Sequence, residues 1–348
     1  MILNNIKKPH FIAEISANHC GNFQLAKKLI KIAKTNGADA VKIQTFTADS
    51  MTLNSTKKIF KIKHGLWKGY KYWDLYNKAK TPLEWHQRLF NYANHLKIKI
   101  FSTPFDSHAV DFLEKLNCPF YKVASFEITD LELIKKIAET KKPIIISTGL
   151  ANLKEIELAY NTALKNGSKE VILMYCVSSY PSKIEDFNLN NIKIIQDKFK
   201  CRVGISDHSN DDKVAELAIA SGADIVEKHI ALKGQKKGLD IKFSLKGNEI
   251  KIFKNKINLA YRLLGKKYFY RSSNEKKNLK FRRSIFAIKS INIGEKFTRK
   301  NIKSLRPGNG LSSIYFSKLI NKKSSKKFIP GQPLNKEVLR KLNIKKLV

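Results

Sequence analysis

Two stretches of the chain, Arg202-Val-Gly-Ile-Ser-Asp-His208 and Asp224-Ile-Val-Glu-Lys-His229, run from apolar residues into polar ones and end in a histidine. Short apolar runs with polar ends are typical of buried β-strands. Two imidazoles at the ends of consecutive strands suit a divalent metal, because neutral nitrogen ligands need a rigid support. An isolated histidine at a strand end is more commonly a hydrogen-bonded structural residue, and that alternative stays open for both.

Similar runs, rich in Ile and Val and with little alternation, recur along the chain and predict strands that are buried on both faces of a parallel sheet. The eight runs are residues 11–15, 40–44, 98–102, 121–125, 144–147, 171–176, 202–206 and 225–229. A segment with helical periodicity follows each of them. Together they predict an α/β fold of the (β/α)8 TIM-barrel type.

Helix boundaries are signalled between these runs. Asn22 is a candidate N-cap, and Thr81-Pro-Leu-Glu84 and Thr129-Asp-Leu-Glu132 predict capping boxes. Residues 152–167 begin with a polar cap and end in glycine. The eighth helix is expected at about residues 245–264.

The predicted domains are a barrel at residues 1–265, a linker at 266–281 that is crowded with Lys, Tyr and Ser, and a second domain at 282–348. The second domain contains a repeat, because Gly294-Glu-Lys-Phe297-Thr298 returns as Gly331-Gln-Pro-Leu334-Asn335. Each copy places a turn glycine before a hydrophobic residue and a Thr or Asn helix cap. A small α+β domain is therefore expected, too small to carry chemistry unaided.

The net charge of +38 would by itself predict a polyanion such as nucleic acid as a partner. Only nine of the 67 basic residues are Arg, however, and the lysines are spread along the chain, so we expect no nucleic-acid partner. The four cysteines lie far apart, which argues against a zinc knuckle or a disulfide framework. No apolar run approaches the ~18 residues of a membrane span, and no signal peptide is evident, so we expect a cytoplasmic protein with no membrane partner.

Barrel enzymes carry their reactive groups at the carboxyl ends of the strands. Those ends supply Glu14, Asn18 and His19; Lys42 and Gln44; Ser102 and Thr103; Lys122, Ser125 and Glu127; Ser147 and Thr148; Cys176, Ser178 and Tyr180; Ser206 and His208; and Glu227 and His229. Two lysines, several hydroxyls and a metal facing one cavity suit a compact, multiply charged anion. The structural alternative is a plain ion pair, for Lys42 with Glu14 and for Lys228 with a neighbouring carboxylate.

The longest insertion follows the second run, from Thr47 to about Lys80, and contains the aromatic stretch Leu66-Trp-Lys-Gly-Tyr-Lys-Tyr-Trp-Asp-Leu-Tyr76. Long loops at the catalytic face of a barrel commonly shape substrate pockets. The alternative is a small apolar cluster that packs the loop onto the barrel.

Taken in order, these strand ends resemble the sialic acid synthase family. The motifs are Glu14-x-x-x-Asn18-His19-x-Gly21, Lys42-Ile-Gln-Thr-Phe46, Ser102-Thr-Pro-Phe105, Tyr121-Lys-Val-Ala-Ser125-Phe-Glu127, Ser147-Thr-Gly149, Tyr180-Pro181, Gly204-Ile-Ser-Asp-His208 and Glu227-Lys-His229. The part from Arg282 onward resembles the C-terminal SAF (antifreeze-like) domain of that family. The resemblance implies a transferase that condenses phosphoenolpyruvate with an N-acetylated amino sugar to give a nine-carbon sugar acid.

The resemblance also implies roles for individual residues. His208 and His229 would be ligands of a divalent metal, Mn2+ first, with Mg2+ or Co2+ as alternatives. Phosphoenolpyruvate would bind to Lys42, Thr103, Lys122, Ser125, Ser147 and Ser206. The sugar would bind to Glu127, Ser178, Tyr180, Glu227 and Arg306, the last reaching a partner subunit's barrel in a domain-swapped homodimer. Glu14 and Asp240 are both candidates for moving protons, and either could be the base.

Within the family, Ser50-Met-Thr-Leu-Asn-Ser55, Gly65-Leu-Trp-Lys-Gly69 and Ser178 resemble the pseudaminic acid branch. The segment Arg306-Pro-Gly-Asn-Gly310 is more similar to the sialic acid form, so synthesis of N-acetylneuraminate or legionaminate is the alternative. Further alternatives are another phosphoenolpyruvate-condensing aldolase, a metal-dependent isomerase, and a non-catalytic polyanion- or carbohydrate-binding protein.

Overall fold

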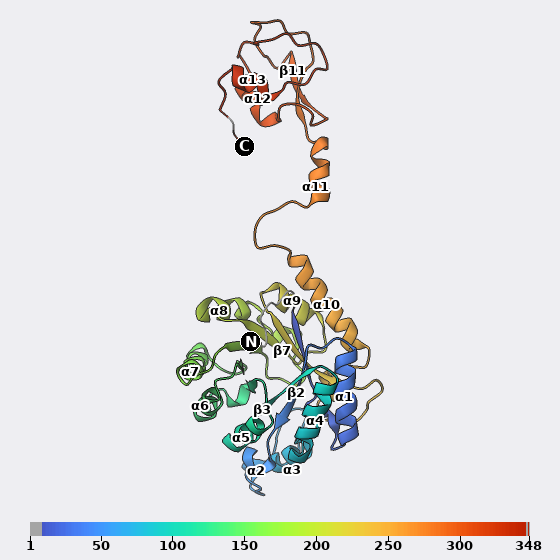
Figure 1. Cartoon of the computed structure of the whole chain (residues 1–348), viewed down its shortest axis with the longest axis vertical. Helices are drawn as coiled ribbons and strands as arrows, with labels where there is room; N and C mark the ends of the chain where they lie inside the picture. Colours follow the sequence, from blue (N-terminus) through green and yellow to red (C-terminus); the bar gives the residue numbers. More distant parts are fainter. Residues whose placement is uncertain (1–8, 346, 348) are drawn as a thin grey trace. The chain divides into compact units, whose positions relative to one another are not determined.

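The computed structural model describes residues 9–345 and 347, which divide into one compact unit up to Gly265 and another from Lys266 onward (Figure 1). In the first unit, eight parallel strands pair in sequence order, and β1 also pairs with β8, so the sheet closes into a barrel. The strands are β1 (His10–Glu14), β2 (Ala40–Thr45), β3 (Lys99–Pro104), β4 (Tyr121–Val123), β5 (Ile144–Ser147), β6 (Val171–Cys176), β7 (Val203–Asp207) and β8 (Ile225–Ala231). The predicted (β/α)8 barrel is confirmed.

The strands are buried on both faces, as their lack of alternation predicts. Every residue of β5, β6, β7 and β8 is buried, because one face points into the barrel and the other packs against helices. Phe11 of β1, for example, packs on Phe253 of the helix at residues 249–264, with ring centroids 5.3 Å apart. In register, Glu14 lies beside Lys42 of β2 on one side and beside His229 of β8 on the other.

Helices surround the barrel (Figure 1). They are α1 (Phe23–Thr35), α4 (Leu83–His95), α5 (Ser107–Lys115), α6 (Leu131–Glu139), α7 (Leu153–Lys165), α8 (Asn190–Phe199), α9 (Lys213–Ala220) and α10 (Glu249–Leu264). Within residues 9–345 and 347, none of the helices is long and apolar enough to cross a membrane.

Of the helix caps predicted in the barrel, two are confirmed and two are wrong. Asn22 caps α1 by accepting from the Leu25 N–H, and Asn152 forms a capping box at α7. At α6 the cap is Asp130 rather than Thr129, because the Asp130 carboxylate accepts from the Leu133 N–H. At α4 the cap position falls on Pro82, without a side-chain hydrogen bond, so Thr81 is not the cap.

The eighth helix starts later than predicted. Leu245 and Lys246 form a short strand, β9 (Leu245–Lys246), which pairs with the end of β8, and α10 begins only at Glu249. Gly247 makes the turn between them with a φ of +58°. The pairing extends β8 through Ala231 and fixes the loop that leads from it.

The second unit has a core of its own, built around Ile285, Phe297 and Phe328. Its regular elements are α11 (Ser273–Lys277), β10 (Ser284–Ala287), β11 (Ile302–Leu305), α12 (Phe316–Leu319) and α13 (Lys336–Lys341), and β10 pairs antiparallel with β11. The predicted linker therefore contains a short helix, α11, capped by Ser272.

Both glycines of the repeat, Gly294 and Gly331, have positive φ angles as turn glycines require. Asn335 caps α13 as expected, because its side chain accepts from the Glu337 N–H. The helix cap predicted at Thr298 is wrong, since the first copy turns directly into β11. There the Thr298 carbonyl accepts from the N–H of Ile302, the first residue of the strand.

Candidate active site

A cavity of about 500 Å³ opens at the carboxyl ends of the barrel strands, a size typical of small-molecule sites. Its lining includes most of the predicted site residues: Lys42, Lys122, Ser125, Glu127, Ser147, Tyr180, Ser206, His208, Glu227, His229 and Asp240. Glu14 and Thr103 lie behind Lys42 and contact its ammonium group. The Ser178 hydroxyl lies 3.8 Å from Cys176 Sγ, which lines the cavity. Arg306 belongs to the other unit, where its side chain is exposed.

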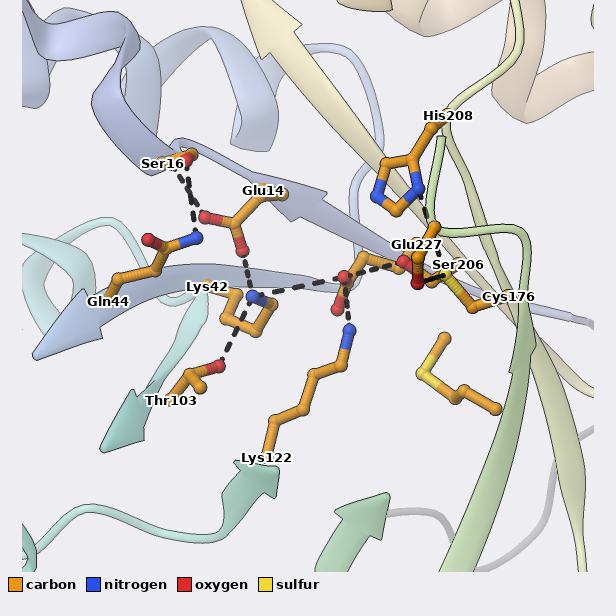
Figure 2. Close-up of polar contacts among 12 residues, drawn as sticks. Glu14, Ser16, Lys42, Gln44, Thr103, Lys122, Cys176, Ser206, His208 and Glu227 are labelled. Carbon is orange, nitrogen blue, oxygen red and sulfur yellow. Dashed lines mark hydrogen bonds and ion pairs between the residues drawn. The ribbon is translucent and has the colours of Figure 1, made fainter. Parts of the chain in front are cut away.

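Two lysines and two glutamates form a buried cluster on the cavity floor (Figure 2). Lys42 Nζ forms an ion pair with Glu14 and lies 3.3 Å from Thr103 Oγ1. On the other side, Glu227 Oε1 lies 2.5 Å from Lys122 Nζ and 3.8 Å from Lys42 Nζ. The Ser206 hydroxyl donates to the same Glu227 oxygen at 3.1 Å. One carboxylate oxygen therefore bridges both lysines.

The cluster holds its two carboxyl groups at different pKa values. Burial raises the pKa of Glu14 to about 7, and Lys42 offsets only part of that effect. Burial acts on Glu227 too, but Lys122 and Lys42 outweigh it and hold its pKa below the ordinary value. Burial likewise lowers the pKa of Lys122, whereas Glu14 and Glu227 raise that of Lys42 against it. At neutral pH Glu227 is therefore ionised, and Glu14 is close to its point of half-protonation.

His208 and His229 lie together beside this cluster, with ring centroids 5.5 Å apart. Burial lowers the pKa of His208 to about 4 and that of His229 well below its ordinary value, so both rings are neutral. His208 Nδ1 lies 3.2 Å from the Val177 carbonyl, which fixes the tautomer with the proton on Nδ1 and leaves Nε2 able to accept. Phe243 packs against both rings.

The two histidines fit a divalent metal as a pair of neutral nitrogen ligands. His229 Nδ1 is buried and has no hydrogen-bond partner among the described residues, although Asp240 Oδ2 lies 3.6 Å away. Within the part of the chain that the structure describes, no group of three or more His, Cys, Asp or Glu side chains could hold a metal by itself. A metal here would need further ligands from substrate or water, as in catalytic rather than structural sites.

Asp240 is held by Asn18, a strand-end residue for which no individual role was predicted. The Asn18 side chain accepts from the Asp240 N–H at 3.3 Å and donates to Ser244 Oγ and to the Ile230 carbonyl. The Ser244 hydroxyl in turn donates to the Asp240 carbonyl at 2.6 Å. Burial raises the pKa of Asp240. One buried amide thus ties the loop that carries Asp240 to the end of β8.

Glu127 has an unusual environment for a carboxylate. Burial raises its pKa to about 7, and its Oε2 atom has no hydrogen-bond partner among the described residues.

Lys228 forms a structural ion pair with a neighbouring carboxylate, which was the alternative considered for it. Its ammonium group lies 2.7 Å from Asp207 Oδ2 and 2.6 Å from the Ser209 carbonyl.

The insertion after β2 contains α2 (Ala48–Met51) and α3 (Tyr72–Ala79) and contributes a large part of the cavity wall. Trp67, Tyr72 and Tyr76 of its aromatic stretch all line the cavity. Trp73 does not, because its indole N–H donates to Asp49 Oδ1 at 2.8 Å. These rings therefore shape the pocket, whereas Trp73 bonds within the insertion itself, since Asp49 also belongs to it.

The chain was compared with known protein families. Residues 29–268 match the model of the NeuB family, and residues 282–340 match that of the SAF domain. The chain belongs to the NeuB family. Among curated NeuB-like relatives, it is 42% identical to the pseudaminic acid synthase of Campylobacter jejuni over 85% of this chain and 86% of that protein. The identity is also 42% with the pseudaminic acid synthase of Helicobacter pylori, over 84% and 86% of the two chains. With the N,N'-diacetyllegionaminic acid synthase of C. jejuni it is 38%.

Solved structures agree with the NeuB assignment. The crystal structure of a putative spore coat polysaccharide biosynthesis protein E from Chromobacterium violaceum has a TM-score of 0.80 and 26% identity, covering 95% of this chain and 99% of that one. The N-acetylneuraminic acid synthetase of Leptospira borgpetersenii has a TM-score of 0.72 and 28% identity over 80% and 94% of the two chains.

Proposed function

We propose that the chain is a phosphoenolpyruvate-dependent transferase that makes pseudaminic acid. Phosphoenolpyruvate, 2,4-diacetamido-2,4,6-trideoxy-L-altrose and water would give pseudaminic acid and phosphate. The observation that carries the proposal is the meeting of two buried lysines and two neutral histidines at one cavity, in a chain 42% identical to pseudaminic acid synthases over most of its length.

The anionic substrate is assigned to the lysine side of the cavity. Lys42 and Lys122 would bind the phosphate and carboxylate of phosphoenolpyruvate, with Thr103, Ser125, Ser147 and Ser206 as hydroxyl donors. Ser147 Oγ is buried and has no hydrogen-bond partner among the described residues, as expected of a donor that awaits an anion. Glu227 holds the two ammonium groups together before substrate arrives.

His208 and His229 would hold the divalent metal, for which we propose Mn2+, with Mg2+ or Co2+ as alternatives. When bound, the metal supplies a Lewis acid for the C1 carbonyl of the open-chain sugar. The protein's own contribution is to keep both imidazoles neutral by burial and to orient His208 through the Val177 carbonyl.

In the reaction, a C–C bond forms between C3 of phosphoenolpyruvate and C1 of the sugar, and C2 becomes electron-poor. Water then adds to C2, and the resulting tetrahedral centre loses phosphate by cleavage of its C–O bond. We propose Glu14 as the group that takes the proton from this water, because it lies beside His229 in the strand register and burial raises its pKa to about 7, which suits an acid–base group at neutral pH. Asp240 remains the alternative, since its carboxyl lies near His229.

The sugar is assigned to the part of the cavity near Tyr180, where Glu127, Ser178 and Tyr180 would contact it, and Glu227 would contact it from the lysine cluster. The unpartnered Glu127 oxygen would accept from a sugar hydroxyl or amide. Arg306 of the SAF domain would bind the sugar in the partner subunit's barrel, which makes the active form a domain-swapped homodimer. The enzyme would work in the cytoplasm.

The test is phosphate release from phosphoenolpyruvate with Mn2+, using 2,4-diacetamido-2,4,6-trideoxy-L-altrose and N-acetylmannosamine in parallel. Turnover with the altrose derivative and not with N-acetylmannosamine is expected. The reverse preference would make the chain an N-acetylneuraminate synthase, which Arg306-Pro-Gly-Asn-Gly310 favours. Preference for 2,4-diacetamido-2,4,6-trideoxy-D-mannose would make it a legionaminate synthase.

A further inference from the structure

Trp67 lines the cavity but has no part in the reaction proposed above. It lies in the insertion, yet its indole N–H donates to the Leu239 carbonyl, 3.3 Å away, on the loop that follows β8. Its ring also packs on the ring of Tyr180, with centroids 5.5 Å apart. The Tyr180 ring in turn packs on that of His208, with centroids 4.5 Å apart. Trp67 thus joins three loops at the side of the cavity next to the histidines.

The wall at Trp67 is built from Tyr180 and the Leu239 loop, which it contacts, and Ile62 and Tyr72 line the same cavity. Lys42 and Lys122 contact Glu14 and Glu227 instead (Figure 2). A sugar hydroxyl placed against such a wall would lose its water without gaining a hydrogen-bond partner, which costs free energy. A methyl group in the same place would gain by burial.

The candidate sugars differ in this respect. N-acetylmannosamine carries hydroxyls at C4 and C6, whereas the 2,4-diacetamido-2,4,6-trideoxy sugars carry an acetamido methyl at C4 and a methyl at C6. We propose that Trp67 is a specificity-determining residue whose ring contacts these methyl groups and so favours the 6-deoxy, 4-acetamido sugars. The inference rests on the proposed function and deepens it, because it concerns the methyl groups and not the altrose configuration.

The test compares kcat/KM of the wild type, Trp67→Ala, Trp67→Phe and Trp73→Ala with three sugars. These are 2,4-diacetamido-2,4,6-trideoxy-L-altrose, its D-mannose isomer and N-acetylmannosamine, the last assayed as a competitive inhibitor where it is not turned over. Trp73→Ala is the matched control, because Trp73 lies in the same insertion but outside the cavity lining. The KM for phosphoenolpyruvate reports whether the site stays folded.

Trp67→Ala is expected to lower kcat/KM for whichever methyl-bearing sugar is used by about 10- to 100-fold, while N-acetylmannosamine and phosphoenolpyruvate change by less than about threefold. Trp67→Phe keeps the aromatic face and is expected to keep the preference. Equal losses with all sugars, or the same loss in Trp73→Ala, would overturn the inference. So would a Phe variant as poor as Ala, because the effect would then come from the bond to Leu239.

The experiment distinguishes failure of the pseudaminic acid assignment from failure of the role proposed for Trp67. A wild type that prefers the D-mannose isomer contradicts the pseudaminic assignment, and Trp67→Ala then still decides the role of Trp67. A wild type that uses N-acetylmannosamine alone overturns both.

Discussion

Lys122 and Glu227 meet across the mouth of the barrel, the one on β4 and the other on β8, with 2.5 Å between Nζ and Oε1. Both side chains are almost fully buried, so their charges depend on each other rather than on water. Lys42 approaches the same oxygen at 3.8 Å. Loss of the Glu227 charge would leave the buried Lys122 ammonium group without its carboxylate partner, while Lys42 would still pair with Glu14.

Glu227→Gln is therefore expected to destabilise the substrate-free protein by about 3 kcal/mol, because breaking a buried ion pair leaves an uncompensated charge. Urea unfolding at pH 7 measures the change. Glu157→Gln is the matched control, since Glu157 pairs with Lys198 at 3.0 Å on the surface. That change is expected to cost less than about 1 kcal/mol. Equal losses of stability in the two variants would show that the Lys122 charge does not depend on Glu227 for compensation.

The role proposed for Glu14 as proton acceptor predicts how turnover depends on pH. Its raised pKa of about 7 means that the carboxyl becomes protonated below neutral pH, where an ordinary glutamate is still ionised. A proton acceptor must be ionised, so kcat is expected to fall as pH drops through about 7. The profile of Glu14→Gln should be low and lack this limb, whereas Asp240→Asn should retain it. A limb that survives in Glu14→Gln and disappears in Asp240→Asn would assign the proton transfer to Asp240.

Metal binding can be tested without turnover. With Mn2+ at about 100 times its Kd, the wild type should gain about 2.7 kcal/mol of stability, seen as a rise in Tm. His208→Ala should lose most of this gain and all Mn2+-dependent phosphate release. His108→Ala is the control, because His108 is exposed on α5. An unchanged Mn2+ response in His208→Ala would remove His208 from the proposed metal site.

The proposed role of Arg306 in a partner subunit's barrel predicts that two inactive variants complement each other. Arg306→Ala alone should raise the KM for the sugar much more than that for phosphoenolpyruvate. When Arg306→Ala and His208→Ala chains are refolded together, each mixed dimer should contain one barrel with His208 intact and an intact Arg306 from the other chain. Activity should then return to about a quarter of the wild-type value, assuming random pairing. If the mixture stays inactive, Arg306 does not act between subunits.

The strands were predictable because burial on both faces leaves a plain signal in the residues themselves. Residues 144–147 and 171–176 match β5 and β6 at both ends. The caps were harder, since neighbouring residues compete for the same N–H group. At α6 the Asp130 carboxylate takes it in place of Thr129, and at α4 the Thr81 hydroxyl instead lies 3.5 Å from His19 Nε2.

The candidate site was predictable where a barrel strand ends in a charged residue, because the fold brings those ends together. The supporting residues were not. Asn18 holds the Asp240 loop through partners that lie 212 to 226 positions away in the chain, and no local pattern marks such a contact. Trp67 could be found as part of an aromatic stretch, but its distinction from Trp73 lies in contacts with distant residues, Leu239 and Tyr180, that no local pattern marks.

Strand β8 carries Glu227 and His229 into the cavity and turns Lys228 between them outward to Asp207. Deletion of one residue ahead of them in this strand would reverse all three and place the Lys228 ammonium group where the Glu227 carboxylate lies. The insertion after β2 is free of that restriction, because it can gain or lose residues without shifting any strand. Descendants of one ancestral enzyme can thus diverge in the sugar they accept while they inherit the same chemistry unchanged.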